Sequence, residues 1–126
     1  MSDNGLVRQK RVLIVDDSKQ ICGVIAKLLE SVDLRPAYDI AQALSAVKTE
    51  RFDLFLLDIY LPDGTGTDLL SMLREDAPET PALFITTAPD FSTEEARSLG
   101  ALGLIRKDSP RFVEDLLDIS AKVLGS

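Results

Sequence analysis

The stretch Val12–Ser18 reads VLIVDDS and points to the fold class: four apolar residues, three of them β-branched, end in two aspartates and a serine. An apolar run without in/out alternation is typical of a strand that is buried on both faces of a parallel sheet. Apolar residues then recur at helical spacing, at Ile21, Ile25, Leu28, Leu29 and Val32. The stretch predicts a buried strand that leads into a helix, with Asp17 or Ser18 as its N-cap.

The same unit, a short apolar run followed by a helical stretch, recurs along the chain and predicts five strands and five helices. The further strands are expected at residues 34–38, 52–57, 82–85 and 102–105, and the further helices around residues 40–47, 69–73, 92–99 and 113–124. Pro36 indicates an edge position for the second strand, because proline has no N–H to donate to a neighbouring strand. Buried strands joined by helical crossovers predict an α/β domain with one parallel sheet and helices on both faces.

Capping signals predict where two of the later helices begin or end. Ser92 and Glu95 have the spacing of a capping box for the fourth helix, and Gly100 stands where a helix-stopping glycine belongs. Ser109 and Pro110 are expected to be the N-cap and the first residue of the last helix. Residues 10–126 are expected to form a single domain, preceded by a disordered tail at residues 1–9.

Charge and hydropathy restrict the expected partners and location. With 14 basic and 21 acidic residues, the formal net charge is 14 − 21 = −7 at pH 7. An anionic surface repels phosphate backbones and anionic lipids, so neither nucleic acid nor a membrane is an expected partner. Residues 1–10 lack the apolar core of a signal peptide, and no apolar run approaches membrane-spanning length. We therefore expect a cytoplasmic protein that is a monomer or a weak dimer.

The chain contains no histidine and only one cysteine, Cys22, which limits its chemistry. A structural zinc site and every catalytic scheme based on Ser-His or Cys-His are excluded. Any bound metal is expected to be a hard cation with oxygen ligands, such as Mg²⁺ or Mn²⁺. Cys22 falls beside the apolar positions of the first helix and is interpreted as a small packing residue.

Four predicted strands end in polar residues: Asp16 and Asp17 after the first, Asp58 after the third, Thr86 at the fourth and Lys107 at the fifth. Ligands of open parallel sheets bind outside the carboxyl ends of the strands, so these side chains are expected to converge. Two like charges about 4 Å apart repel by roughly 4 kcal/mol at an effective dielectric of about 20, so crowded carboxylates need a cation or a raised pKa. A carboxylate here can attack phosphorus to give an aspartyl phosphate, whose oxygens a lysine and a hydroxyl would bind.

Taken singly, each of these residues also fits an ordinary role: a helix cap, a turn, a strand residue or a solvated lysine. Together they resemble the receiver domain of bacterial two-component response regulators. The segments 58–64, DIYLPDG, and 100–103, GALG, strengthen this resemblance, which covers about residues 10–124. It implies a domain similar to a single-domain chemotaxis regulator, with the flavodoxin-like strand order 2-1-3-4-5.

The resemblance also implies a role for each residue of the site. Asp58 corresponds to the phosphorylated aspartate and is also a metal ligand. Asp17 corresponds to a direct metal ligand, and Asp16 to an aspartate that usually binds the metal through a water molecule. The backbone carbonyl of Tyr60 would be a further metal ligand. The two remaining positions are those of the switch hydroxyl, Thr86, and of the phosphate-pairing lysine, Lys107.

On this resemblance the protein is a signalling module and not an enzyme, apart from catalysing its own phosphorylation and dephosphorylation. The expected phosphoryl donor is a sensor histidine kinase or a histidine phosphotransfer protein, and a downstream protein would contact the fourth helix, fifth strand and last helix. One alternative stays open: a receiver fragment of a longer response regulator or hybrid kinase. A pseudo-receiver that takes no phosphate is disfavoured, because the acidic pair, Asp58 and Lys107 are all present. An aspartyl-phosphate phosphohydrolase resembling the haloacid dehalogenases is disfavoured, because such enzymes need a second aspartate where Tyr60 stands.

Four positions depart from the pattern of the family. Leu104 replaces an aromatic residue that reports phosphorylation by moving with the switch hydroxyl, and Asp108 replaces the proline that usually follows the lysine. Tyr60 stands at a position that influences how water reaches the phosphoryl group, and its bulk is expected to slow dephosphorylation. Thr87 stands where a small residue is common and is expected to narrow access to the phosphorylated aspartate.

Overall fold

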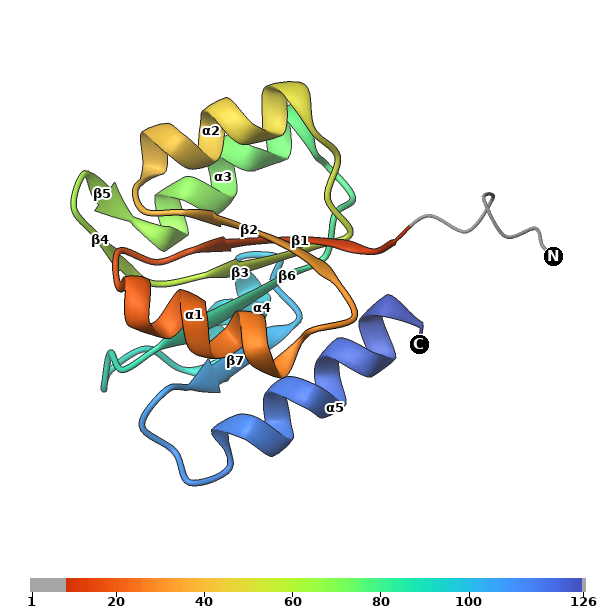
Figure 1. Cartoon of the computed structure of the whole chain (residues 1–126). Helices are drawn as coiled ribbons and strands as arrows, with labels where there is room; N and C mark the ends of the chain where they lie inside the picture. The colour runs from red at the N-terminus through yellow and green to blue at the C-terminus, as the bar shows by residue number, and fades with distance from the viewer. Residues whose placement is uncertain (1–8, 126) are drawn as a thin grey trace, which may run out of the picture.

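A computed structural model describes residues 9–125 of the chain. Five strands form one parallel sheet in the order β2-β1-β3-β6-β7 (Figure 1). Their bounds are Arg11–Val15 (β1), Asp33–Ala37 (β2), Leu54–Leu57 (β3), Ala82–Thr86 (β6) and Gly103–Arg106 (β7). Counted within this sheet alone the order is 2-1-3-4-5, so the predicted flavodoxin-like sheet is confirmed.

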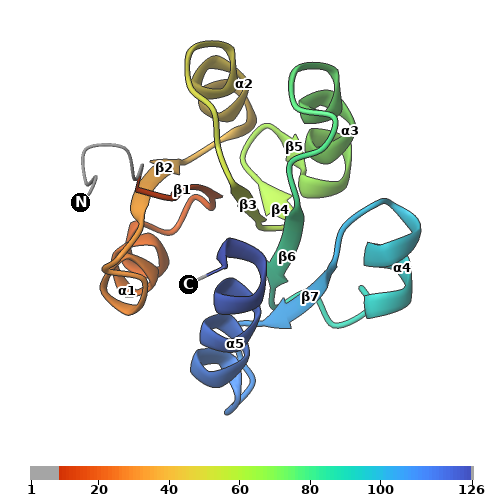
Figure 2. The same cartoon turned by 90° about the vertical axis from the view of Figure 1, so that its right-hand side faces the viewer.

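Two helices cover one face of the sheet and three cover the other (Figure 2). The first pair is α1 (Lys19–Leu28) and α5 (Phe112–Leu124), and the opposite layer is α2 (Ile40–Thr49), α3 (Gly66–Asp76) and α4 (Thr93–Ser98). A short antiparallel hairpin, β4 (Tyr60–Leu61) and β5 (Gly64–Thr65), joins β3 to α3. The sequence predicts the five helices but not this hairpin.

Alternate residues of the central strands point to opposite faces of the sheet and build two apolar clusters. The cluster under α2, α3 and α4 contains Leu13, Val15, Phe55, Leu57 and Phe84, all fully buried. The cluster under α1 and α5 contains Val12, Ile14, Leu54, Leu56 and Ile85, also fully buried. Helices on both faces explain why these strands are apolar at every position. β2, which carries Pro36, lies at an edge of the sheet as predicted.

The predicted helix signals are confirmed at α1 and α4. Ser18 is the N-cap of α1, and its hydroxyl accepts the Ile21 N–H at 3.2 Å, so Asp17 is not used as the cap. The capping box of α4 is complete, because the Ser92 hydroxyl accepts the Glu95 N–H at 3.0 Å and the Glu95 carboxylate accepts the Ser92 N–H at 3.3 Å.

The predicted start of the last helix is wrong. α5 begins at Phe112, and Arg111 occupies the N-cap position without a side-chain capping bond. The Ser109 hydroxyl instead accepts the Arg111 N–H at 3.1 Å, and its carbonyl accepts the Phe112 N–H at 3.1 Å. Ser109 and Pro110 therefore belong to a turn between β7 and α5 that the local cap pattern does not distinguish from a helix start.

The ends of the chain are only partly described. The predicted disordered tail lies outside the described residues except for Gln9, whose side-chain amide donates to the Ser31 carbonyl at 3.2 Å. The expected domain at residues 10–126 is described up to Gly125. Between residues 9 and 125, no helix is long and apolar enough to cross a membrane.

Candidate functional site

Four neighbouring strands carry the predicted site residues at their carboxyl ends. Asp16 follows β1, Asp58 follows β3, Thr86 ends β6 and Lys107 follows β7. Backbone hydrogen bonds extend the sheet one step beyond its strands: the Asp58 N–H donates to Val15 O at 2.9 Å, and the Lys107 N–H donates to Thr86 O at 3.1 Å. The parallel register thus fixes the backbone under each of these side chains before any side-chain contact is made.

Three aspartates meet at this edge. One carboxylate oxygen each of Asp16, Asp17 and Asp58 lies within 4.8 Å of the other two. Asp16 is fully buried and Asp58 is 7% exposed, whereas Asp17 faces solvent. Hard oxygen ligands at this spacing, with one of them open to water, fit a magnesium or manganese ion that keeps part of its water shell. The structure therefore brings together the acidic trio that the sequence predicts.

Lys107 joins two of these carboxylates. Its Nζ lies 2.5 Å from Oδ2 of Asp16 and 3.2 Å from Oδ2 of Asp58. Burial lowers the pKa of Lys107, but the hydrogen bond to Asp16 and the charges of both aspartates outweigh burial, so its pKa lies above the ordinary value. Burial raises the pKa of the Asp58 carboxyl; Lys107 opposes this shift and Asp16 adds to it. A cation at this edge is favoured because one lysine does not balance three carboxylates.

The second oxygens of the two buried carboxylates are held by the backbone. Oδ1 of Asp16 accepts the Ser18 N–H at 2.9 Å, and Oδ1 of Asp58 accepts the Ile59 N–H at 2.8 Å. Each carboxylate is thus fixed between a backbone N–H and the lysine ammonium. Such fixed orientations reduce the reorganisation that a reaction at these oxygens requires.

Thr86 contributes a buried hydroxyl next to this cluster. Its side chain is fully buried, and Oγ1 accepts the Ala88 N–H at 3.0 Å. A threonine hydroxyl accepts and donates at once, so this bond leaves its proton available to an oxygen atom of a ligand. Thr86 ends β6, the strand beside β3, which is the strand that carries Asp58.

The four positions that depart from the family pattern differ in their burial and contacts. Tyr60 opens β4 with its side chain 62% exposed, and Thr87 is also exposed. Leu104 is partly buried and packs against the cluster under α2, α3 and α4. Asp108 is exposed, and within residues 9–125 the ion pairs of Lys107 go to the two buried aspartates instead.

The sequence misses two residues that support the site. Asp63 accepts the N–H groups of Ile40 at 2.8 Å and Ala41 at 3.1 Å, and these bonds to the start of α2 lower its pKa. Gly66, the first residue of α3, lies so close to Asp58 that a Cβ at residue 66 would stand 1.9 Å from the Asp58 carbonyl oxygen. Neither role leaves a local signal: Asp63 bonds to a helix start 23 residues away, and Gly66 meets Asp58 only because the hairpin of β4 and β5 folds the chain back.

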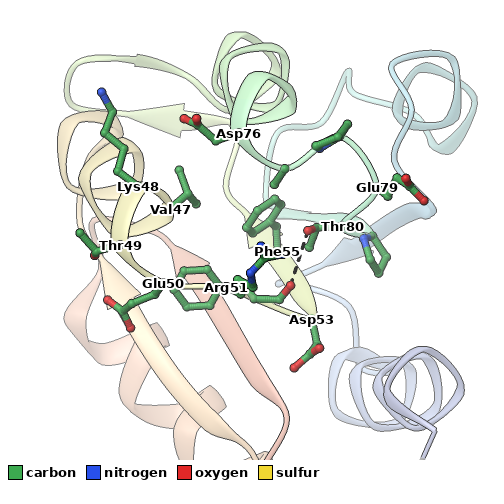
Figure 3. Close-up of a pocket in the computed structure, with 14 residues that line it drawn as sticks. Val47, Lys48, Thr49, Glu50, Arg51, Asp53, Phe55, Asp76, Glu79 and Thr80 are labelled. Carbon is green, nitrogen blue, oxygen red and sulfur yellow. Dashed lines mark hydrogen bonds between the residues drawn. The ribbon is translucent and has the colours of Figure 1, made fainter.

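A separate hollow lies at the opposite edge of the sheet, where α2 and α3 end (Figure 3). Its volume is about 810 Å³, and its floor includes Phe52 and Phe55. Glu50 on its rim pairs with Arg11 and Arg35, so this charged group is already engaged within the protein. The hollow is remote from the carboxyl ends of the strands and is not part of the predicted site.

A sequence model of the response regulator receiver domain matches residues 12–118 of this chain. The chain belongs to this family. The receiver domain is 33% identical over 102 residues to the response regulator protein PilR of Pseudomonas aeruginosa, a match that covers 79% of this chain and 23% of PilR. It is 38% identical over 112 residues to the transcriptional regulatory protein DltR of Streptococcus agalactiae, covering 85% of this chain and 48% of DltR. The receiver domain thus spans less than half the length of these two relatives.

Solved structures show the same fold over nearly the whole receiver domain. A CheY-like receiver domain protein from Methanospirillum hungatei has a TM-score of 0.81 and 31% identity, and the match covers 94% of this chain and 96% of that one. The chemotaxis response regulator CheY4 of Vibrio cholerae has a TM-score of 0.79 and 30% identity, covering 92% of this chain and 99% of that one. The predicted resemblance is therefore confirmed. The family is one of signalling domains of two-component systems.

Proposed function

We propose that this receiver domain accepts a phosphoryl group on Asp58, with a Mg²⁺ or Mn²⁺ ion held at the acidic trio. The supporting observation is the position of Asp58 in the sheet: β3 lies between β1 and β6, so Asp58 has Asp16 and Asp17 on one side and Thr86 and Lys107 on the other. A phosphoryl group on Asp58 would therefore have metal ligands on one side and hydrogen-bond donors on the other.

Each residue has a separate task in this proposal. An oxygen of the Asp58 carboxylate forms a bond to phosphorus while the P–N bond of a phosphohistidine breaks, and the electron pair leaves with the imidazole nitrogen. The Lys107 ammonium pairs with a phosphoryl oxygen, and the Thr86 hydroxyl donates to another. The carboxylates of Asp16, Asp17 and Asp58 and the Tyr60 carbonyl would hold the ion. When bound, the ion neutralises charge on the phosphoryl and carboxylate oxygens.

Its relatives suggest the partners of the receiver domain. As a relative of response regulators, it would take its phosphoryl group from a sensor histidine kinase or a histidine phosphotransfer protein. We propose α4, β7 and α5 as the surface for a downstream protein, because Leu99 and Leu102, each 46% exposed, offer apolar contacts beside α4 and β7. The same chemistry is proposed whether the domain acts alone or within a longer regulator or hybrid kinase. The cytoplasmic location and the monomeric or weakly dimeric state stay predictions.

Incubation with acetyl phosphate and Mg²⁺ tests this function directly. We expect the intact mass to rise by one phosphoryl group, and we expect EDTA to prevent the rise because the ion offsets the repulsion among the carboxylates. Mg²⁺ alone should also raise the melting temperature, by an amount that corresponds to about 2.7 kcal/mol when the ion is at 100 times its dissociation constant. A protein that gains no mass under these conditions, or gains it equally in EDTA, would contradict the proposal.

Tyr60 is expected to protect the phosphoryl group from water. Its bulky side chain stands two residues after Asp58 and is 62% exposed. Replacing it by alanine should speed the loss of phosphate by up to about tenfold, which corresponds to roughly 1.4 kcal/mol in the barrier. The measurement is the decay of the phosphorylated mass after donor removal. Tyr60→Phe keeps the ring and should decay like the wild type; equal decay of Tyr60→Ala and the wild type would refute the idea.

A further inference from the structure

Arg106, the last residue of β7, reaches across to the loop that joins β6 to α4. Its Nη1 donates to the carbonyl of Ala88, and its Nη2 donates to the carbonyls of Phe91 at 2.5 Å and Pro89 at 3.4 Å. Within the described residues, no carboxylate lies at ion-pair distance from this guanidinium. We name this set of contacts the Arg106 clamp.

The Arg106 clamp ties the β6–α4 loop to β7. Residues 87–92 have no helix or strand of their own, although the Ser92 carbonyl accepts the Ala96 N–H of α4 at 3.0 Å. A hydrogen bond to a charged donor contributes about 1.5–3 kcal/mol, roughly twice the contribution of a neutral one. Phe91 directly precedes Ser92, the N-cap of α4, so the clamp also ties the start of that helix to β7.

The clamp is connected to Thr86 through a single residue. Ala88 donates its N–H to the Thr86 hydroxyl at 3.0 Å and accepts from Arg106 at its carbonyl. Ala88 is only 3% exposed, so water does not readily replace a lost partner. A buried N–H without a partner costs about 1–3 kcal/mol. If the Thr86 hydroxyl turns toward a phosphoryl oxygen on Asp58, the Ala88 N–H is therefore expected to follow it. The Ala88 carbonyl, joined to this N–H through the Cα, then moves relative to Arg106.

The side chain of Leu104 offers no such connection, because it has no hydrogen-bonding group. Residues two apart on a strand share a face, so Leu104 and Arg106 project from the same side of β7. Leu104 packs into the apolar cluster under α2, α3 and α4. Arg106 lies further along the same side of β7 and bonds to the loop. Arg106 is therefore the residue of this face that links β7 to the loop by hydrogen bonds.

We propose that Arg106 is a positioning residue that couples the Thr86 hydroxyl to α4. The Arg106 clamp holds the β6–α4 loop in its unphosphorylated arrangement, and a phosphoryl group on Asp58 loosens the clamp by drawing Thr86 and Ala88 toward the site. The start of α4 is then released from β7, which changes the α4-β7-α5 surface. This inference rests on the proposed phosphorylation of Asp58 and adds the path by which it is transmitted.

The test compares amide NMR spectra with and without Mg²⁺ and beryllofluoride, a stable mimic of a phosphoryl group. In the wild type, the signals of residues 87–98 should shift when the mimic is added. Arg106→Met keeps the apolar stem and removes every N–H donor, so these signals should be displaced before the mimic is added and should lose most of their further shift. Uptake of phosphate from acetyl phosphate, read by intact mass, should be retained.

Arg97→Met is the matched control. Arg97 lies on α4 and donates to the Leu102 carbonyl at 3.3 Å, so it also bonds the backbone but does not touch the β6–α4 loop. Its variant should respond to beryllofluoride like the wild type. A wild-type response of residues 87–98 in Arg106→Met would overturn the inference, and so would loss of phosphate uptake, since Arg106 would then act in the chemistry itself.

Two further comparisons keep the test decisive. Arg106→Lys keeps the charge but not the forked donor geometry. In this variant the signals of residues 87–98 should lose part, but not most, of their shift on addition of beryllofluoride. If Arg106→Met does not fold, a full wild-type response of Arg106→Lys overturns the inference. Failure of the wild type to gain a phosphoryl mass would refute the proposed function of Asp58, whereas a mass gain with an unchanged α4 response in the variant refutes the clamp alone.

Discussion

An Asp58→Asn variant is expected to take up no phosphoryl group from acetyl phosphate in the presence of Mg²⁺. An amide is too weak a nucleophile to attack phosphorus, and the variant also removes one negative ligand from the acidic trio. Asp16 and Asp17 remain in place, so the result separates Asp58 from its two neighbours. The intact mass should stay that of the unmodified chain under conditions in which the wild type is modified.

The same variant should not lose stability at neutral pH. Burial raises the pKa of Asp58 in the folded protein, so the stability linked to its protonated form is present at low pH and is lost as the pH rises through the raised pKa. Asparagine stays neutral and does not lose that stability. The measured quantity is the unfolding free energy of Asp58→Asn minus that of the wild type. This difference should increase as the pH rises from about 4, the ordinary pKa of aspartate, toward 7.

A surface carboxylate provides the control for this variant. Asp118 is exposed on α5, and Asp118→Asn should gain the phosphoryl mass like the wild type. A mass gain that survives in Asp58→Asn would mean that another residue accepts the phosphoryl group. A difference in unfolding free energy that falls with rising pH would contradict the stated effect of burial on Asp58.

A Gly66→Ala variant is expected to be the most damaging small substitution in the chain. Helix propensity alone would favour alanine by about 1 kcal/mol. The Cβ would stand 1.9 Å from the Asp58 carbonyl oxygen and 3.2 Å from the Ile59 Cα, and both are backbone atoms that a rotamer change does not move. We expect the steric clash to outweigh the gain in helix propensity and to lower the unfolding free energy by about 3 kcal/mol. Urea denaturation measures this change.

The clash should also displace the phosphorylation site. The Gly66 N–H donates to the Ile59 carbonyl at 2.7 Å, so the start of α3 is bonded to the residue that follows Asp58. A shift of about 1 Å at a reacting group reduces rates by roughly 100-fold, and phosphorylation of Gly66→Ala by acetyl phosphate should slow to this extent.

Gly23→Ala is the matched control for the glycine. Gly23 lies within α1, is exposed, and has nothing within 4 Å of the position that a Cβ would take. It should therefore gain stability by about 0.5–1 kcal/mol and keep the phosphorylation rate of the wild type. If Gly66→Ala were stabilised by a similar amount, the backbone of α3 and Asp58 would have to move apart at little cost in free energy, and the prediction would be wrong.

The strand and helix order could be predicted because its signals are local. The run at residues 12–15 is buried on both faces, and the residues that end such runs are polar: Asp16, Asp58 and Lys107. Parallel strands place their carboxyl ends at one edge, so the order of the strands carries these residues to one site. The cap at Ser92 was also predictable, since a capping box lies within four residues.

The start of α5 shows where local signals fail. Ser109 and Pro110 have the composition of a helix start, yet the Ser109 hydroxyl bonds within the turn before Phe112. The turn and the helix cap use the same donor and acceptor types, so composition does not separate them. What separates them is the path that the chain must take from Lys107, at the site, to the first buried residue of the helix.

The sequence by itself determined the fold class, the strand ends and the residue types that meet there, because apolar periodicity and strand polarity act over a few neighbouring residues. Only the tertiary structure decided that Asp63 accepts N–H groups at the start of α2, that Gly66 allows α3 to approach Asp58, and that Arg106 bonds the loop after Thr86. Each of these contacts joins segments that folding brings together. Their distances depend on how helices and strands pack, and packing depends on the whole core rather than on any short stretch of the chain.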